Sequence, residues 1–163
     1  MTGLGYPLRA LWASYLRAGL GLGLMAYWLI VATPGWFGSV ALGGLALVFG
    51  IYGLRTALRH ATRYGFDDHG VYSVGPISRA IKWDELANVK LSYYTTKRDG
   101  TSGWWQLDIK GRKSTMRIDS TLDGFAALAE RAVREARARG VELSPTTIGN
   151  LGSLGIEIAD DGQ

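Results

Sequence analysis

The sequence predicts an integral membrane protein: a hairpin of two transmembrane helices, followed by a cytoplasmic antiparallel β domain that a C-terminal helix closes. Three observations predict this fold class. The 37 residues between Arg17 and Arg55 include no charged side chain. From Tyr64 onward, apolar and polar residues alternate with a period of two, as in half-buried strands. A later stretch repeats its apolar residues at intervals of three and four, as an amphipathic helix does.

The uncharged stretch is long enough for two spans. A Thr-Pro-Gly run at residues 33–35 interrupts it, and the part that follows measures about 28 Å as a helix, close to the roughly 30 Å of a hydrocarbon core. We therefore expect a transmembrane hairpin over residues 11–59, with helices at about 11–32 and 36–57. A cytoplasmic N-terminus at 1–10 precedes it.

Charge is unevenly distributed along the chain. Residues 1–63 contain five arginines and no acidic residue, whereas residues 141–163 contain four acidic residues and no basic one. This asymmetry indicates a membrane or another charged surface. Nucleic acid is a less favoured partner, because the basic residues of 64–140 are interleaved with acidic ones. The chain has no cysteine, which excludes disulfides, thiolate metal sites and a cysteine nucleophile.

The arginines set the expected orientation. They flank the outer ends of the hairpin and none lies in its turn, so both termini are expected in the cytoplasm of a bacterial inner (plasma) membrane. Residues expected at the lipid interface are Trp12, Tyr15, Arg17, Trp36, Arg55 and Arg59. A buried soluble hairpin would need a larger shell than the remaining residues provide. A cleaved signal peptide would put Ile30 where a small residue is required.

Both expected spans contain pairs of small residues four positions apart. Gly19 and Gly23 form one pair, and Ala46 and Gly50 form another. Small residues let helix backbones approach closely in lipid. Two interpretations stay open: these residues pack the two helices of the hairpin together, or they bind another membrane subunit.

Residues 60–140 are expected to form the β domain. Ile81 and Trp83, Val89 and Leu91, and Trp105 and Leu107 alternate with polar residues, which predicts about six short antiparallel strands. A closing helix is expected over 121–139. Ser120 and Asp123 resemble a capping box at its start, and its apolar face comprises Leu122, Phe125, Leu128, Ala129, Ala132, Val133 and Ala136. The domain should therefore be complete at Gly140.

Two short motifs in this domain carry a family resemblance. Phe66-Asp67-Asp68-His69-Gly70-Val71-Tyr72 and Ile81-Lys82-Trp83-Asp84-Glu85-Leu86, placed after two membrane helices, resemble the bacterial pleckstrin-homology-like membrane proteins, especially the YcxB-like group. The resemblance covers roughly residues 10–140. It implies a pleckstrin-homology-like barrel that binds a partner and performs no chemistry. The basic cluster with which eukaryotic pleckstrin-homology domains bind phosphoinositides has no counterpart in residues 71–79.

No catalytic centre, cofactor site or metal site is expected. Asp67, Asp68 and His69 could be a metal cluster, but adjacent carboxylates on a tight turn more often cap that turn. His60 is interpreted as a residue of the membrane interface. The basic turns at 97–98 and 110–113 are either attracted to anionic lipid or simply solvated.

These observations predict a non-enzymatic, membrane-anchored interaction protein, an accessory or assembly subunit of a larger inner-membrane complex. Its partners would be the lipid bilayer and other integral membrane subunits. Trp104 is expected to point outward and to anchor a partner. The composition of the acidic tail, 141–163, predicts disorder, unless its apolar residues pack against another subunit. The alternatives are a sensor of anionic lipid, an enzyme with an unrecognised active site, and a small channel, which the absence of intramembrane charge disfavours.

Overall fold

The computed structural model of the protein describes residues 3–95 and 103–156. The chain divides into two compact units. The helical unit comprises Tyr6–Thr62, and the β unit comprises Met1–Gly5 together with Arg63–Gln163.

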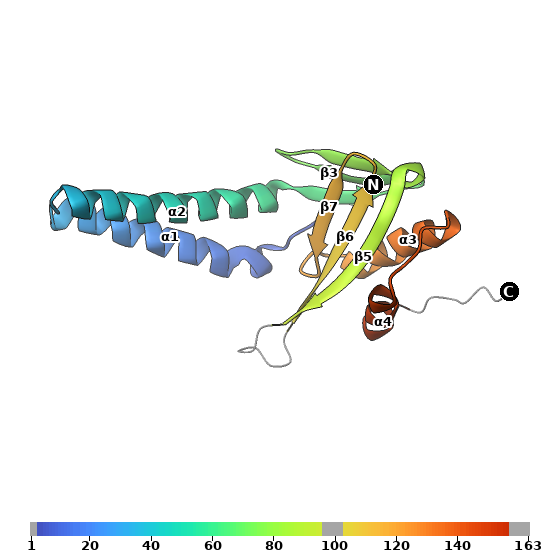
Figure 1. The fold of residues 1–163 in the computed structure, drawn as a ribbon. Helices are drawn as coiled ribbons and strands as arrows, with labels where there is room; N and C mark the ends of the chain where they lie inside the picture. Colours follow the sequence, from blue (N-terminus) through green and yellow to red (C-terminus); the bar gives the residue numbers. More distant parts are fainter. Residues whose placement is uncertain (1–2, 96–102, 157–163) are drawn as a thin grey trace. The chain divides into compact units, whose positions relative to one another are not determined.

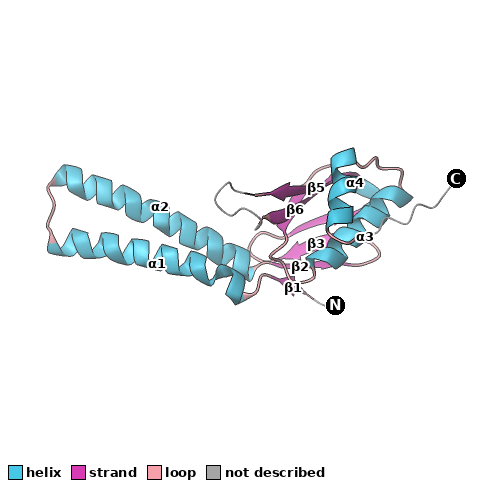
Figure 2. Cartoon of the chain, turned by 90° about the horizontal axis from the view of Figure 1, so that it is seen from below, coloured by secondary structure: helices cyan, strands magenta, loops and turns pink. Residues whose placement is uncertain are grey.

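The helical unit consists of two long helices that run side by side, α1 (Leu8–Val31) and α2 (Trp36–Ala61) (Figures 1 and 2). Both are long and apolar enough to cross a membrane by length and composition, which confirms the predicted pair of apolar helices. Pro34 ends α1, because a proline disfavours helical backbone at the residue before it. Helix α1 begins three residues before the expected position, and α2 continues four residues beyond it.

Small residues do pack α1 against α2, but Gly19 and Gly23 are not among them. A Cβ atom at Gly21 would lie 2.3 Å from the ring of Phe49, and one at Gly53 would lie 3.3 Å from the Cβ of Ala18. By contrast, a Cβ atom at Gly19 or at Gly23 would have no neighbour within 4 Å. Gly19 and Gly23 therefore take no part in the packing of α1 against α2.

The β unit contains two antiparallel sheets (Figure 1). The first has the order β1-β2-β3-β4, and the second has the order β5-β6-β7. Their strands are β1 (Leu4–Gly5), β2 (Arg63–Phe66), β3 (Gly70–Val74), β4 (Arg79–Lys82), β5 (Leu86–Tyr94), β6 (Trp104–Gly111) and β7 (Thr115–Asp119). The Arg79 guanidinium donates to the Thr115 carbonyl at 2.9 Å and so links β4 to β7.

The segment before the first helix contributes a strand that the sequence did not predict. Leu4 pairs with Tyr64, and Gly5 pairs with Arg63. The amide of Asp123 also donates to the carbonyl of Gly5. The boundaries expected for the N-terminal segment, 1–10, therefore differ from the structure: residues 4–5 belong to the first sheet, and α1 already begins at Leu8.

The core confirms the predicted alternation. The inward residues that are buried are Ile81, Trp83, Val89, Leu91, Leu107, Ile109, Met116 and Ile118. The indole of Trp83 is 1% exposed and donates its N–H to the carbonyl of Asp67 at 2.8 Å. Trp105 lies on the same inner face as Leu107, but it is only half-buried.

Helix α3 (Phe125–Ala138) begins later than expected. The hydroxyl of Ser120 does not cap it and instead accepts the backbone N–H of Trp105 at 3.0 Å. Gly124 precedes the helix with a φ of 80°, a left-handed conformation that glycine adopts without strain. The predicted apolar face is confirmed, since Leu128, Ala129 and the other residues assigned to it are buried.

The expected disordered tail instead forms a helix. Helix α4 (Pro145–Ser153) starts at a Ser144 cap, whose hydroxyl accepts the N–H of Thr147. Both α3 and α4 contact β5 (Figure 2). The side chains of Thr147 and Leu151 are fully buried, so the β unit is not complete at Gly140. The remainder of the acidic tail, from residue 157, lies outside the described residues.

Candidate functional site

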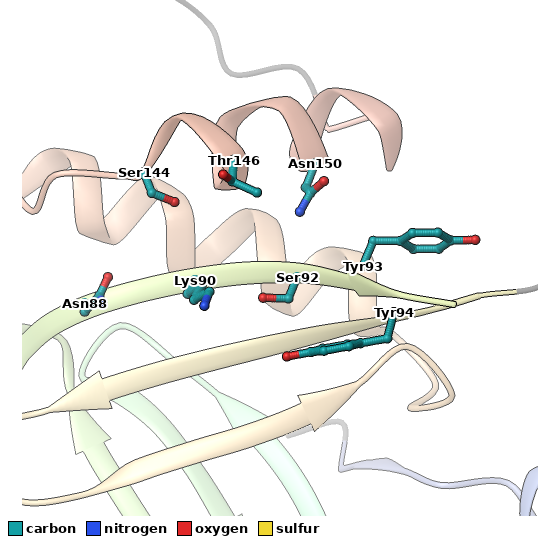
Figure 3. Close-up of a pocket in the computed structure, with 8 residues that line it drawn as sticks. All are labelled: Asn88, Lys90, Ser92, Tyr93, Tyr94, Ser144, Thr146 and Asn150. Carbon is teal, nitrogen blue, oxygen red and sulfur yellow. The ribbon is translucent and has the colours of Figure 1, made fainter. Parts of the chain in front are cut away.

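A cleft of about 610 Å³ lies between β5 and α4. Figure 3 shows side chains of α4 pointing toward the strand beneath it. Its lining comprises Asn88, Lys90, Ser92, Tyr93 and Tyr94 from β5, and Ser144, Thr146 and Asn150 from α4 and its cap. We call this site the β5–α4 cleft.

The alternation of β5 creates one wall of the cleft. Val89 and Leu91 point into the core, so Lys90 and Ser92 face the other way. Helix α4 provides the opposite wall, and two side chains attach it to the edge of β5. The Thr147 hydroxyl accepts the Leu91 N–H at 3.4 Å, and the Asn150 amide donates to the Leu91 carbonyl at 2.8 Å. These bonds satisfy backbone groups that β6 does not reach.

The lining of the cleft consists of hydroxyls, amides, aromatic rings and one ammonium group, that of Lys90. These groups can hydrogen-bond a polar or anionic ligand. Among the described residues, no three His, Asp or Glu side chains gather closely enough to hold a metal ion.

Two aromatic pairs stand at one end of the cleft, where β5 and β6 approach the loop between them. Tyr93 pairs with Trp105, and Tyr94 pairs with Trp104. The ring centroids are 4.6 Å apart in the first pair and 5.7 Å apart in the second. We call these four residues the aromatic end. Trp104 is exposed there, as the sequence predicts.

The other residues predicted to bind a partner lie on α1 and α2. Gly19 and Gly23 border open space, and so does Gly50. Ala46, one helical turn before Gly50, is half-buried. The structure thus leaves a glycine-lined surface on each helix that the hairpin does not fill.

The residues predicted at the lipid interface fall into two groups. Trp12 and Trp36 are strongly exposed, and Arg17 and Arg55 are exposed. Tyr15 and Arg59 are half-buried and make contacts within the helical unit. The hydroxyl of Tyr15 lies 3.2 Å from Nδ1 of His60, and the guanidinium of Arg59 lies 4.1 Å from the centre of the Tyr6 ring.

The side chain of Asp67 caps the turn that it begins, at residues 67–69. The carboxylate of Asp67 accepts the backbone N–H groups of His69 and Gly70 at 2.8 and 3.0 Å. These two hydrogen bonds lower the pKa of Asp67 below its ordinary value of 3.8. The neighbouring Asp68 forms an ion pair with Arg131 of α3 at 2.9 Å. The carboxylates thus tie the β2–β3 turn to itself and to α3.

No protein-family model, curated protein or solved structure matches this chain. The resemblance to pleckstrin-homology-like membrane proteins therefore stays a prediction.

The cleft is not predicted from the sequence, because the composition of residues 141–163 is typical of a disordered tail. A signal was present: Ser144 followed by Pro145 is a typical N-cap and first helical residue. The basic turn at 97–98 lies outside the described residues. The turn at 110–113 is tight, with the Gly111 N–H bound to the Ser114 carbonyl.

Proposed function

We propose that this protein is a membrane-anchored interaction protein without catalytic activity. The observation that carries the proposal is the apolar surface of α1 and α2. Leu20 is 65% exposed, Ile30 is 76% exposed and Leu47 is 65% exposed. Contact with water costs about 25 cal/mol for each Å² of such surface, whereas a bilayer removes this cost. The helical unit is therefore proposed to span a membrane.

The arginines support an orientation with both termini in the cytoplasm of a bacterial inner membrane. Because the chain lacks cysteine, single cysteines test this directly. Gly35→Cys lies in the turn between α1 and α2, and an added Cβ there meets no neighbour. In intact cells, a membrane-impermeant thiol reagent should label Gly35→Cys. It should label Lys110→Cys only after permeabilisation. Labelling of Lys110→Cys in intact cells would show that the β unit lies outside the cytoplasm and would contradict the proposed topology.

The β unit is proposed to be the binding part of the molecule. Two antiparallel sheets with helices at the C-terminal end support the proposed pleckstrin-homology-like character. The β5–α4 cleft provides hydrogen-bonding groups on a rigid strand and helix, which favours recognition of a polar segment of a partner.

An accessory or assembly role in a larger membrane complex fits the glycine-lined surfaces of α1 and α2. Gly19 and Gly23 on α1 and Gly50 on α2 leave room for another helix. The test is purification of the full-length chain in a mild detergent, followed by identification of proteins recovered in stoichiometric amount. A stoichiometric integral membrane protein supports the proposal, and recovery of the chain alone contradicts it.

Sensing of anionic lipid is the second candidate function. The β6–β7 turn supports it, since the side chains of Lys110, Arg112 and Lys113 are all exposed there. Each such cation adds about 1 kcal/mol of attraction to an anionic leaflet. Hydrogen exchange in nanodiscs separates the candidates. Protection of this turn that requires anionic lipid and disappears at high salt would favour lipid sensing.

A further inference from the structure

We propose that the aromatic end of the β5–β6 hairpin inserts into the interface of the bilayer, as a second membrane contact besides α1 and α2. This inference rests on the proposed membrane function and changes the occupant expected at Trp104. The contact would be with lipid, not with a protein.

Three of the four rings of the aromatic end are exposed, and Trp105 is half-buried. Tyr93 and Tyr94 are each 41% exposed, and Trp104 is 40% exposed. Their cross-strand pairs lie at the end of the ladder between β5 and β6, beyond the residues that pair with β7, which reach only to Gln106. Tyrosine and tryptophan combine an apolar ring with a polar group, and this combination suits the bilayer interface.

Aromatic rings lie on both faces of the ladder between β5 and β6. Tyr93 and Trp105 share the face of the core residue Leu91, whereas Tyr94 and Trp104 lie on the opposite face. A protein that docks on a sheet covers one face. Lipid surrounds an inserted projection on both faces, so it can cover all four rings.

The covalent connections between the helical unit and the β unit are short. Only Tyr6 and Pro7 separate β1 from α1, and only Thr62 separates α2 from β2. The step from Gly5 to Leu8 therefore spans at most about 11 Å. With α1 and α2 in a membrane, these connections keep the β unit close to the bilayer surface in every orientation.

The test uses single cysteines in the full-length chain, carrying an environment-sensitive fluorophore in nanodiscs of zwitterionic lipid, to which the basic β6–β7 turn is not attracted by charge. Trp104→Cys and Tyr94→Cys report on one face of the aromatic end, and Tyr93→Cys reports on the other. The matched control is Lys110→Cys, which lies on the same strand and the same face as Trp104 but six residues away, about 20 Å along β6. Leu45→Cys, in the middle of α2, is the reference for a membrane-embedded position.

The fluorophores are quenched either by a lipid with a nitroxide on its headgroup or by iodide in the water. We expect the lipid quencher to act several times more strongly at Trp104→Cys and Tyr93→Cys than at Lys110→Cys, and iodide to show the opposite order. Tyr94→Cys replaces Trp104→Cys if that variant does not fold.

Three results would overturn the inference. Iodide quenching at the aromatic end as strong as at Lys110→Cys would show that the rings face water. Protection from both quenchers would show a protein contact. Lipid quenching on one face alone would show that lipid does not surround the aromatic end. In each case, lipid exposure of Leu45→Cys leaves the proposed membrane function intact, whereas water exposure of Leu45→Cys removes that function as well.

Discussion

The helical unit and the β unit place their apolar side chains in opposite ways. In α2, only Thr56 is buried, and large apolar residues such as Leu47 and Ile51 point outward. In α3, which is about half as long, six residues are buried, and all six are apolar. The β unit therefore carries its own hydrophobic core, whereas the helical unit leaves most of its large apolar side chains exposed.

The largest expected difference in stability between the two units concerns one tryptophan in each, Trp83 and Trp36. Trp83→Ala removes a buried ring from the β unit together with its hydrogen bond to Asp67, and should lower the free energy of unfolding by about 3–5 kcal/mol. Trp36→Ala removes an equally large but strongly exposed ring from α2 and should change stability little in detergent. Thermal unfolding of the two full-length variants measures the difference, and equal losses would contradict it.

The next effect concerns α4. Leu151→Ala should destabilise the β unit by about 2–4 kcal/mol, because this side chain is fully buried. The control is Ile148→Ala on the same helix, where an exposed side chain should cost less than about 1 kcal/mol. Denaturant unfolding of both variants checks this. Equal midpoints would mean that α4 does not belong to the cooperative unit.

A smaller effect separates two glycines of α1. Gly21→Leu should destabilise the hairpin by about 1–3 kcal/mol, because the new side chain overlaps the ring of Phe49. Gly23→Leu meets no neighbour, so it should leave the melting temperature in detergent unchanged and lower recovery of a partner subunit instead. Unchanged recovery with Gly23→Leu would remove the proposed helix-docking surface.

The smallest effect is a dependence on pH in the β2–β3 turn. Because hydrogen bonds lower the folded-state pKa of Asp67, its stabilising contribution is present above the unfolded pKa and is lost as the pH falls through the folded pKa. Asp67→Asn should remove this part of the acid dependence, whereas Asp68→Asn should retain it. NMR titration of the Asp67 carboxyl group in the full-length chain should give a pKa below 3.8.

The sequence predicted the features that repeat over many residues. The uncharged stretch, the alternation through Val89 and Leu91, and the apolar face of α3 each contain several turns or pleats, so chance patterns are rare. The pattern also assigned Trp104 to the outer face and Trp83 to the core, and the structure confirms both.

The features that were missed are short or depend on distant contacts. Strand β1 has two residues, too few to show a period, and it forms only because Arg63 and Tyr64 lie beside it in the fold. Helix α4 is rich in Gly, Ser and Thr, a composition typical of loops. The spacing of Ser120 to Asp123 fits a helix cap. In the fold, however, the hydroxyl of Ser120 accepts a hydrogen bond from the backbone of β6 instead.

The pairing of β1 with β2 has a consequence for the order of assembly during synthesis. Gly5 leaves the ribosome long before its partner Arg63, and the whole helical unit is made between them. In the proposed topology, both strands lie on the same, cytoplasmic side once α1 and α2 have each crossed the bilayer. A chain that stopped halfway, with one helix inserted, would hold Gly5 and Arg63 on opposite sides of the membrane. Pairing of β1 with β2 would then distinguish a fully inserted hairpin from one in which a single helix has crossed the bilayer.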